Sequence, residues 1–511
     1  REVLDLGLEI GCGMLAHGAS VSSAIRASRH AMRDLGMAEY HTDVTGNMII
    51  VSVRGETDGE PLTAMRVVPI GHQDFELITM LQQVASEARN NSIPDSRARI
   101  EAILGRHGRW GGLDVSLGFG AVSSAAALMF GARWIVGLLA LIVAWSIHRT
   151  QVWLSKRRVS VFFQQCVGGA MAAAAAVGVA LAKGWGVPGL AGIEPGLIVI
   201  GAIISMLAGL AILGASEDAI SGLYVTGTAH AIHGLIVTIG LVIGASVVVA
   251  GASWLGIPVW INAQFSIDGL LGPVSVFWSG IVGAAWAFCT RASRRAIVSA
   301  GLIGAASWWF FLWLLAQRWP VVAATGAAAL LVGAASAAAA RLLRVQLDSI
   351  SASAVVPILP GLVTWSGVLK LALGTGETSF VDGQQDLMTA AAVGIILAAG
   401  VAAGAAFGGA CGLIFNAALV TPMAFAGAVA ALWLVGLIAW RSGGGGAHLV
   451  LAGVIANAVL SAGVTFLKAV ADDRLGAIVL WLMGSFSGAG PEGAAAVWAA
   501  AVLVLLPAWA C

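Results

Sequence analysis

From Leu113 onward the chain is a succession of apolar runs, many of them close to the ~20 residues that a helix needs to cross a bilayer. Charged residues make up only 10% of the chain, whereas soluble domains carry about 25%. This number of charged residues is too small to cover the water-exposed surface of a soluble protein of this length. Most of the chain must therefore lie in the lipid bilayer. We predict a mainly α, polytopic helical membrane protein.

Ten of these runs form a first body. They lie near residues 113–132, 134–147, 160–182, 196–214, 229–250, 272–290, 296–316, 319–340, 352–374 and 385–407. Three to four further apolar segments follow in residues 408–511. Gly and Ala are abundant throughout, which suits close packing of helices in lipid.

Residues 1–112 differ from the rest because they hold roughly half of all charged residues. Hydrophobic spacing predicts helices near 21–35 and 75–85, and strands at 48–53 and 65–68. Asp95, after Pro94, is expected to cap a last short helix. We therefore predict a small α+β domain, called the head below.

The basic residues of the loops orient the chain. With the head in the cytoplasm, the loops on that side hold Arg149, Lys156, Arg157, Arg158, Arg291, Arg294, Arg295, Arg341 and Arg344, and those on the other side hold Arg133, Lys183 and Arg318. Loops rich in Lys and Arg stay in the cytoplasm. We expect a multi-pass protein of the cytoplasmic membrane with a cytoplasmic head.

The ten helices also divide into two sets of five, 113–255 and 256–407. Residues 204–246 run through Leu207-Ala-Gly209, a polar stretch and a Gly-rich helix, and residues 356–405 repeat that order from Leu359-Pro-Gly361. Because five is odd, the second set must be inverted in the membrane. Inverted repeats with interrupted helices are typical of secondary transporters, and the interruptions mark the substrate site.

Ionisable residues near these interruptions are the candidate site, because charged groups at membrane depth are costly and usually functional. The first set offers Glu217, Asp218, His230 and His233 for proton exchange, and the second offers Glu377, Asp382 and Asp386. Pro360 and Gly361, which mark the second interruption itself, complete the candidate site. We expect Asp218 to reach a central cavity from the cytoplasm, and Asp382 or Asp386 to reach it from outside. The alternative is that both polar stretches are solvated loops.

Three segments in a fixed order are distinctive: Gly13–Ser20 before a helix that ends at Asp34-Leu-Gly36, Glu217–Gly222, and Pro357–Leu362. In this order, with a soluble head before ten helices, about residues 1–407 resemble the threonine/serine exporter family. The resemblance implies export of threonine, serine and related small amino acids, driven by the proton gradient. The chain departs from the family pattern at Leu207-Ala-Gly209, where a proline like Pro360 is expected.

Residues 408–511 carry different motifs, at Pro422–Ala428, Leu451-Ala-Gly453, Ala471-Asp-Asp473 and Trp481–Gly488. These resemble a middle slice of the iron-siderophore/vitamin B12 class of ABC permeases. This slice stops before the cytoplasmic segment by which such permeases dock on their ATPase, and no Walker motif occurs in the chain. We therefore expect no ATPase partner and interpret this tail as a fused or misjoined remnant.

Two other functions stay open. One is the permease subunit of an ABC importer, based on the tail; the other is a membrane-anchored hydrolase that uses His17, His41 and His72 of the head. Five widely separated cysteines without CxxC spacing indicate neither a metal site nor a disulfide framework. We expect no cofactor; the partners are an amino acid, protons and lipid, with no nucleic acid, and a homo-oligomer stays open.

Overall fold

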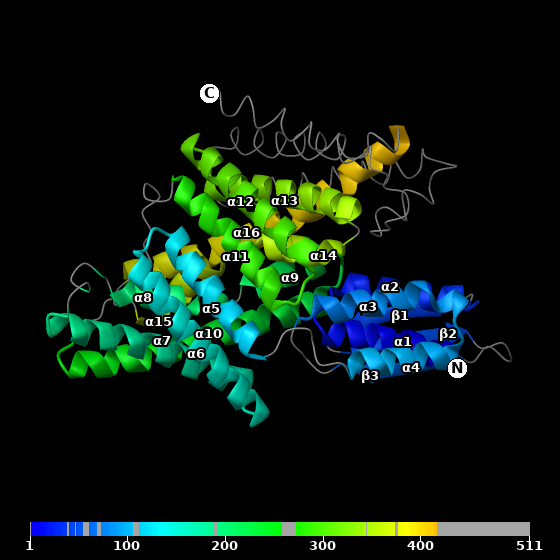
Figure 1. The fold of residues 1–511 in the computed structure, drawn as a ribbon, viewed down its shortest axis with the longest axis horizontal. Helices are drawn as coiled ribbons and strands as arrows, with labels where there is room; N and C mark the ends of the chain where they lie inside the picture. The colour runs from blue at the N-terminus through cyan, green and yellow to red at the C-terminus, as the bar shows by residue number, and fades with distance from the viewer. Residues whose placement is uncertain are drawn as a thin grey trace.

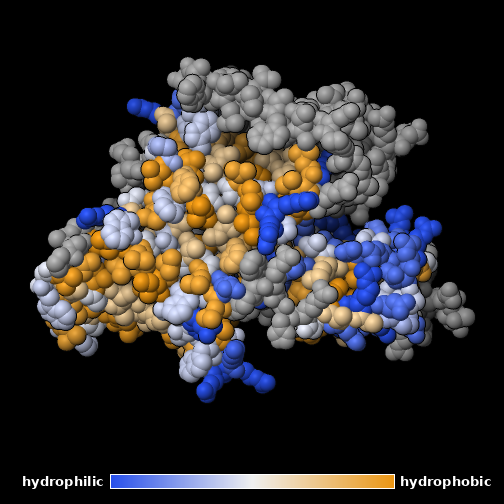
Figure 2. All heavy atoms as spheres, viewed as in Figure 1, coloured by the Kyte–Doolittle hydropathy of each residue, from blue (hydrophilic) through white to orange (hydrophobic). Residues whose placement is uncertain are grey.

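The computed structural model describes residues 2–37, 40–45, 48–54, 61–68, 73–105, 112–187, 190, 193, 195–207, 209–257, 272–343, 345–373 and 377–415. A polar head lies at one end of a large helical body (Figure 1). The surface of the head is mostly hydrophilic and that of the body mostly hydrophobic (Figure 2). This division follows the distribution of charge along the sequence.

The head is a small sheet covered by helices. Its elements are α1 (Glu2–Ala16), α2 (Val21–Asp34), β1 (Tyr40–Thr45), β2 (Met48–Arg54), β3 (Pro61–Val67), α3 (Phe75–Ser86), the 3-10 turn η1 (Ala88–Asn90) and α4 (Ile93–Leu104). The strands form one antiparallel sheet in the order β1-β2-β3. Leu6, Ile10, Ile78 and Leu81 of α1 and α3 are fully buried and form the centre of its core.

The predicted α+β head is confirmed in its α2, β2, β3 and α3 elements. The sequence did not predict α1 or β1. The prediction that Asp95 caps the last helix is wrong: α4 begins at Ile93, and the side chain of Ser92 accepts from the Asp95 backbone N–H. Pro94 then occupies the first helical turn, where its missing N–H costs nothing.

Among the described residues, each predicted apolar run of the body contains a helix. The elements are α5 (Gly112–Met129), α6 (Trp134–Lys156), α7 (Val161–Gly184), α8 (Pro195–Ile203), η2 (Ile204–Met206), α9 (Gly209–Ile220), α10 (Tyr224–Trp254), α11 (Pro273–Cys289), α12 (Arg294–Ala316), α13 (Val321–Leu343), α14 (Leu347–Ala354), η4 (Val356–Ile358), α15 (Gly361–Leu373) and α16 (Glu377–Phe415). Among the described residues, seven helices are long and apolar enough to cross a membrane, and α14–α15 add an eighth as a bent pair. Two shorter apolar helices, α5 and α11, complete the ten segments.

The two halves of the body have the same sequence of elements: three helices, one helix interrupted by a 3-10 turn, and one long helix. The same helices also pack together in each half. In the first half α5 packs on α6, α7 on α10, and α9 on α10; in the second, α11 packs on α12, α13 on α16, and α15 on α16. The halves meet most extensively through α5 and α11, and also where α9 packs on α15 and α16 and where α10 packs on α15.

Glycines allow the closest of these contacts. A methyl group on Gly240 or Gly244 of α10 would collide with the carbonyl oxygens of Phe162 or Cys166 on α7. Likewise, a methyl group on Gly400 or Gly404 of α16 would collide with the carbonyls of Gly326 or Leu330 on α13. The small residues of both long helices therefore let the backbones approach, as in other membrane helix pairs.

The head docks on one end of the body. Arg291 Nη1, in the turn between α11 and α12, donates to Asp74 Oδ2 of the head at 2.6 Å. Ser23 Oγ of α2 donates to Asp348 Oδ2 in the first turn of α14 at 2.8 Å. The head therefore contacts the first half of the interrupted helix α14–α15.

Residues 408–511 lie outside the described residues, apart from the helical backbone up to Phe415. The three to four apolar segments predicted for the tail therefore lie outside the part of the chain that the structure describes.

Candidate functional site

The two interrupted helices break at equivalent leucines, and the second one bends by 48° at its break. Leu207 follows η2 with φ −66° and ψ 145°, and Leu359 follows η4 with φ −67° and ψ 143°. Each extended residue stands two positions before the glycine that begins the next helix. The first interruption forms without a proline, so the departure from the family pattern at Leu207 does not remove the break.

The two interruptions touch each other reciprocally. A methyl group on Gly209 would lie 3.0 Å from Cβ of Leu359, and one on Gly361 would lie 2.9 Å from Cβ of Leu207. Each of these methyl positions is 3.4 Å from the backbone nitrogen of the other glycine. The first turns of α9 and α15 therefore lie against each other.

A small hollow lies beside this crossing. It has a volume of about 50 Å³ and lies between α5, α11 and the two interruptions. Its lining consists of Val122, Ala126, Met129, Phe130, Ile204, Leu207, Gly209, Leu210, Val282, Trp286, Val356, Pro357, Leu359, Gly361 and Leu362. Since a water needs roughly 10–15 Å³ of such space, the hollow has room for a few waters and less than an amino acid needs.

Backbone chemistry makes this crossing unusual. The first N–H groups of a helix have no intrahelical partner, and the helix dipole makes that end electropositive. Two such ends, at Gly209 and Gly361, meet inside an apolar surrounding. A carboxylate is the group best suited to such a place.

An ion pair joins α9 to α10 at one end of the body. His230 Nδ1 lies 2.8 Å from Asp218 Oδ2. The side chain of Asp218 is 11% exposed and that of His230 is 48% exposed. Glu217 lies close enough to Asp218, His230 and Asp348 to interact with them electrostatically.

A second ion pair joins α15 to α16. Lys370 Nζ donates to Asp386 Oδ2 at 2.7 Å, and Ser366 Oγ donates to the same oxygen at 2.8 Å. Asp386, predicted from its position in the second repeat, is therefore a paired carboxylate. Lys370 was missed, although a single lysine inside an apolar run is a signal that could have found it.

The two ion pairs occupy matching positions with their charges exchanged. Asp218 comes nine residues after Gly209, and Lys370 comes nine residues after Gly361. Their partners lie on the long helices α10 and α16. His230 follows Gly227 of α10 by three residues, and Asp386 follows Gly383 of α16 by three residues. Both of these glycines pack on the preceding helix, Gly227 on the Ala215 carbonyl and Gly383 on the Gly367 carbonyl.

The structure brings some of the predicted site residues together and leaves others apart. Pro360 and Gly361 are buried at the crossing. Asp218 lies about 13 Å along α9 from Gly209 at 1.5 Å per residue, and it does not line the hollow. His233 and Asp382 are exposed, and the side chain of Glu377 lies outside the described residues.

Asp348 lies in the first turn of α14 but does not cap this helix. Gln346 is the N-cap residue, and its side chain makes no capping bond. Asp348 instead accepts from Ser23, and from Ser20 at 3.4 Å. It is a contact between the head and the body.

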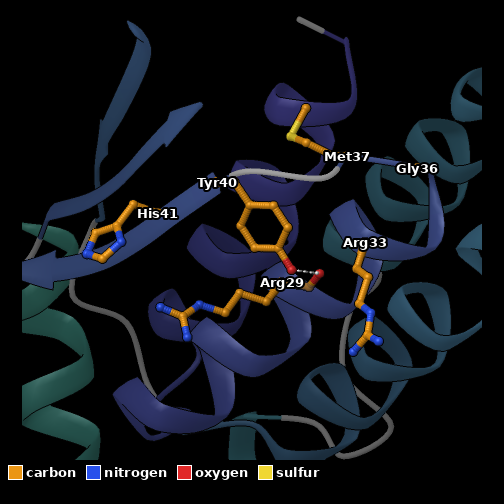
Figure 3. Close-up of a pocket in the computed structure, with 6 residues that line it drawn as sticks. All are labelled: Arg29, Arg33, Gly36, Met37, Tyr40 and His41. Carbon is orange, nitrogen blue, oxygen red and sulfur yellow. Dashed lines mark hydrogen bonds between the residues drawn. The ribbon is translucent and has the colours of Figure 1, made fainter. Parts of the chain in front are cut away.

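The head has a larger hollow of its own, about 620 Å³, lined by Arg29, Arg33, Gly36, Met37, Tyr40 and His41. The Tyr40 hydroxyl donates to the Arg29 carbonyl at 3.0 Å, while the Arg33 guanidinium points away from Arg29 and His41 (Figure 3). The basic groups therefore do not converge on one point. His17 hydrogen-bonds the Gly13 carbonyl at the end of α1, and His72 lies outside the described residues.

Comparison with known proteins agrees with this architecture. The family described as "Putative threonine/serine exporter" matches residues 5–251, and "Threonine/Serine exporter, ThrE" matches residues 275–407. Residues 5–251 and 275–407 belong to the threonine/serine exporter family. Its members are membrane exporters, so the chain is a transporter and not an enzyme.

Two curated members of the exporter family align with the chain. A probable threonine/serine exporter of Mycobacterium tuberculosis is 25% identical over 79% of this chain and 76% of its own length. A threonine/serine exporter of Corynebacterium glutamicum is 26% identical over 47% of this chain and 50% of its own length. No solved structure matches the chain significantly.

The tail matches a different family model. Residues 394–511 match the "FecCD transport family". The resemblance of the tail to ABC permeases is thereby confirmed, and the match begins within α16, the last helix of the exporter body.

Proposed function

We propose that this chain exports threonine, serine and related small amino acids across the cytoplasmic membrane. Membership of the exporter family supports the class of function. The observation that carries the mechanism is the reciprocal contact of two interrupted helices at Gly209 and Gly361.

The substrate carboxylate would bind where α9 and α15 begin. Two electropositive helix ends face one another there, and backbone N–H groups need no side chain to hold an anion. The hollow beside them is too small for the substrate, so binding requires the half-helices to separate. The interruptions are the natural hinges, because Leu207 and Leu359 already stand outside helical geometry.

The body would be two inverted five-helix repeats, 113–255 and 256–407. Support comes from the equal order of elements, the equal packing partners and the matching dihedral angles at Leu207 and Leu359. The gap between the two family matches, residues 252–274, also includes the predicted division. In this arrangement α9 ends on the cytoplasmic side and α15 ends on the outer side.

The charge-exchanged ion pairs would then lie on opposite sides of the membrane. Asp218–His230 would stand at the cytoplasmic end and Lys370–Asp386 at the outer end. Each pair ties a moving half-helix to the long helix beside it. Breaking one pair while keeping the other would open one side of the substrate site at a time, as alternating access requires.

Proton coupling would use Asp218 and His230. A carboxylate and an imidazole 2.8 Å apart can share or release a proton, and a partly exposed imidazole gives the proton a path to water. The head would lie in the cytoplasm, consistent with the basic residues of the loops on its side.

The export function can be tested in cells preloaded with threonine or serine dipeptides. Cells expressing the chain should release more of the amino acid than cells with an empty vector. If cells with the chain release no more than empty-vector cells, for each of several small amino acids tested, the export function is contradicted.

Proton coupling is tested by Asp218→Asn. This variant should lower export and weaken its dependence on pH at unchanged expression, because an amide cannot exchange the proton. Asp43→Asn makes the same chemical change at an exposed position of β1 in the head and should behave as the original chain. An Asp218→Asn variant with an unchanged pH profile would remove this pair from the coupling mechanism.

The tail favours a second candidate, a permease subunit of an ABC importer. Such a subunit would copurify with an ATPase through residues 408–511. Copurification that is lost when this segment is deleted would support the second candidate.

A further inference from the structure

The hollow at the crossing is lined by apolar side chains with one notable exception. Trp286 of α11 is, among its described lining residues, the side chain that carries an N–H donor. The indole Nε1 is buried and has no hydrogen-bond partner among the described residues. A donor in that situation costs free energy, so folded proteins pair nearly all such groups.

The surroundings of Trp286 define the ligand that would satisfy this donor. On one side the hollow has the helix starts at Gly209 and Gly361, which suit a carboxylate. The remaining lining residues, such as Val122 and Leu362, suit small apolar groups. A ligand that fits all three features has a carboxylate, a small side chain and one further hydrogen-bond acceptor.

We propose that the Trp286 indole N–H donates to the side-chain hydroxyl of the substrate and thereby selects hydroxyl-bearing amino acids. This inference rests on the proposed export function and adds the residue that sets its specificity. A site that donates to a substrate hydroxyl rejects the analogue without it, because the donor is then left buried and unpaired.

Phe119 offers the main competing explanation for the orientation of Trp286. The two rings are perpendicular with centroids 5.8 Å apart, an arrangement that aromatic pairs favour by themselves. If this contact alone positions the indole, the N–H has no part in selection. The two explanations differ in what removal of the N–H does to substrate preference.

The test compares export of serine with alanine, and of threonine with 2-aminobutyrate, each pair differing by one hydroxyl. Trp286→Phe keeps an aromatic ring and removes the N–H. It should reduce the preference for the hydroxyl-bearing member of each pair by about three- to tenfold, the range of one lost hydrogen bond.

Trp365→Phe is the matched control. Trp365 is fully buried on α15 and its Nε1 also lacks a partner among the described residues, but it does not line the hollow. This variant should keep the original preference. An unchanged preference in Trp286→Phe, or an equal change in both variants, would overturn the proposal.

The phenylalanine ring is smaller than the indole, so Trp286→Phe also changes the packing. A second replacement separates the effect of the N–H from the effect of ring size. Incorporating the benzothiophene analogue of tryptophan at position 286 keeps the shape of the indole and removes only the N–H. It should change the preference as Trp286→Phe does, and an unchanged preference would overturn the proposal. Absence of export by the unmodified chain would instead contradict the export function itself.

Discussion

Lys370 and Asp386 show how a charged pair can exist in an apolar helix bundle. Each group is costly by itself in such a place, and their contact at 2.7 Å, with Ser366 as a third partner, offsets part of that cost. Both side chains are partly exposed, so the pair contributes less to stability than a fully buried one.

Asp386→Asn should leave the Lys370 ammonium poorly paired and destabilise the protein by about 1–2 kcal/mol. Thermal unfolding of the purified protein in detergent measures this change. The double exchange Lys370→Asp with Asp386→Lys should recover most of the loss. If the exchange is no better than the single change, the direct pairing of these two residues is not what stabilises α15 on α16.

At the scale of elements, the long helices α7 and α10 depend on glycines at their contact. A methyl group on Gly244 would overlap the Cys166 carbonyl, whereas one on Gly251, farther along α10, would meet nothing within 4 Å. Gly244→Ala should therefore destabilise the bundle by about 1–3 kcal/mol through overpacking. Gly251→Ala should be neutral or slightly stabilising, because Ala is the better helix former.

Melting temperatures of the two glycine variants, measured side by side in one detergent, decide this prediction. If the Gly244→Ala protein has the same melting temperature as the Gly251→Ala protein, α7 and α10 can move apart without a cost in stability.

The sequence predicted the elements of the body well, because each apolar run is long enough to stand as its own signal. It located the second interruption through Pro360 but left the first in doubt, because Leu207-Ala-Gly209 has no helix-breaking proline. It could not predict that these two interruptions touch or that Lys370 pairs with Asp386. Hydrophobicity is nearly uniform around these helices, so the pattern holds little information about which faces meet.

The head was predicted less completely. Strand β1, with the sequence Tyr-His-Thr-Asp-Val-Thr, alternates buried and exposed residues, but its polar composition hides the alternation. Helix α1 contains several glycines and gave no clear helical signal. The head also owes part of its placement to contacts such as Asp74–Arg291 and Ser23–Asp348, which join residues far apart in the sequence.

At the scale of the whole molecule, Asp74 couples the head to the body. Its buried carboxylate accepts from the Leu77 backbone N–H and from Arg291. Arg291→Ala removes the second partner and should cost about 1–3 kcal/mol. Hydrogen exchange of the full chain should show faster exchange in the first turn of α3, by about tenfold or more.

Arg294→Ala is the control for this prediction, because Arg294 is an exposed arginine three residues farther along. It should leave the exchange of α3 unchanged. Equal protection in Arg291→Ala and the original chain would mean that the other contacts hold the head without this ion pair.

The reciprocal contact of Gly209 with Leu359 also affects how the protein is made. Helices α8 and α9 contain nine and twelve residues, and neither half alone spans a bilayer of about 30 Å. At a synthesis rate of ~5–20 residues per second, Leu359 is made about 8 to 30 seconds after Gly209. During that interval the first interrupted helix lies in the membrane without its partner, so a ribosome that stalls between the two halves would leave a fragment that cellular quality control can recognise.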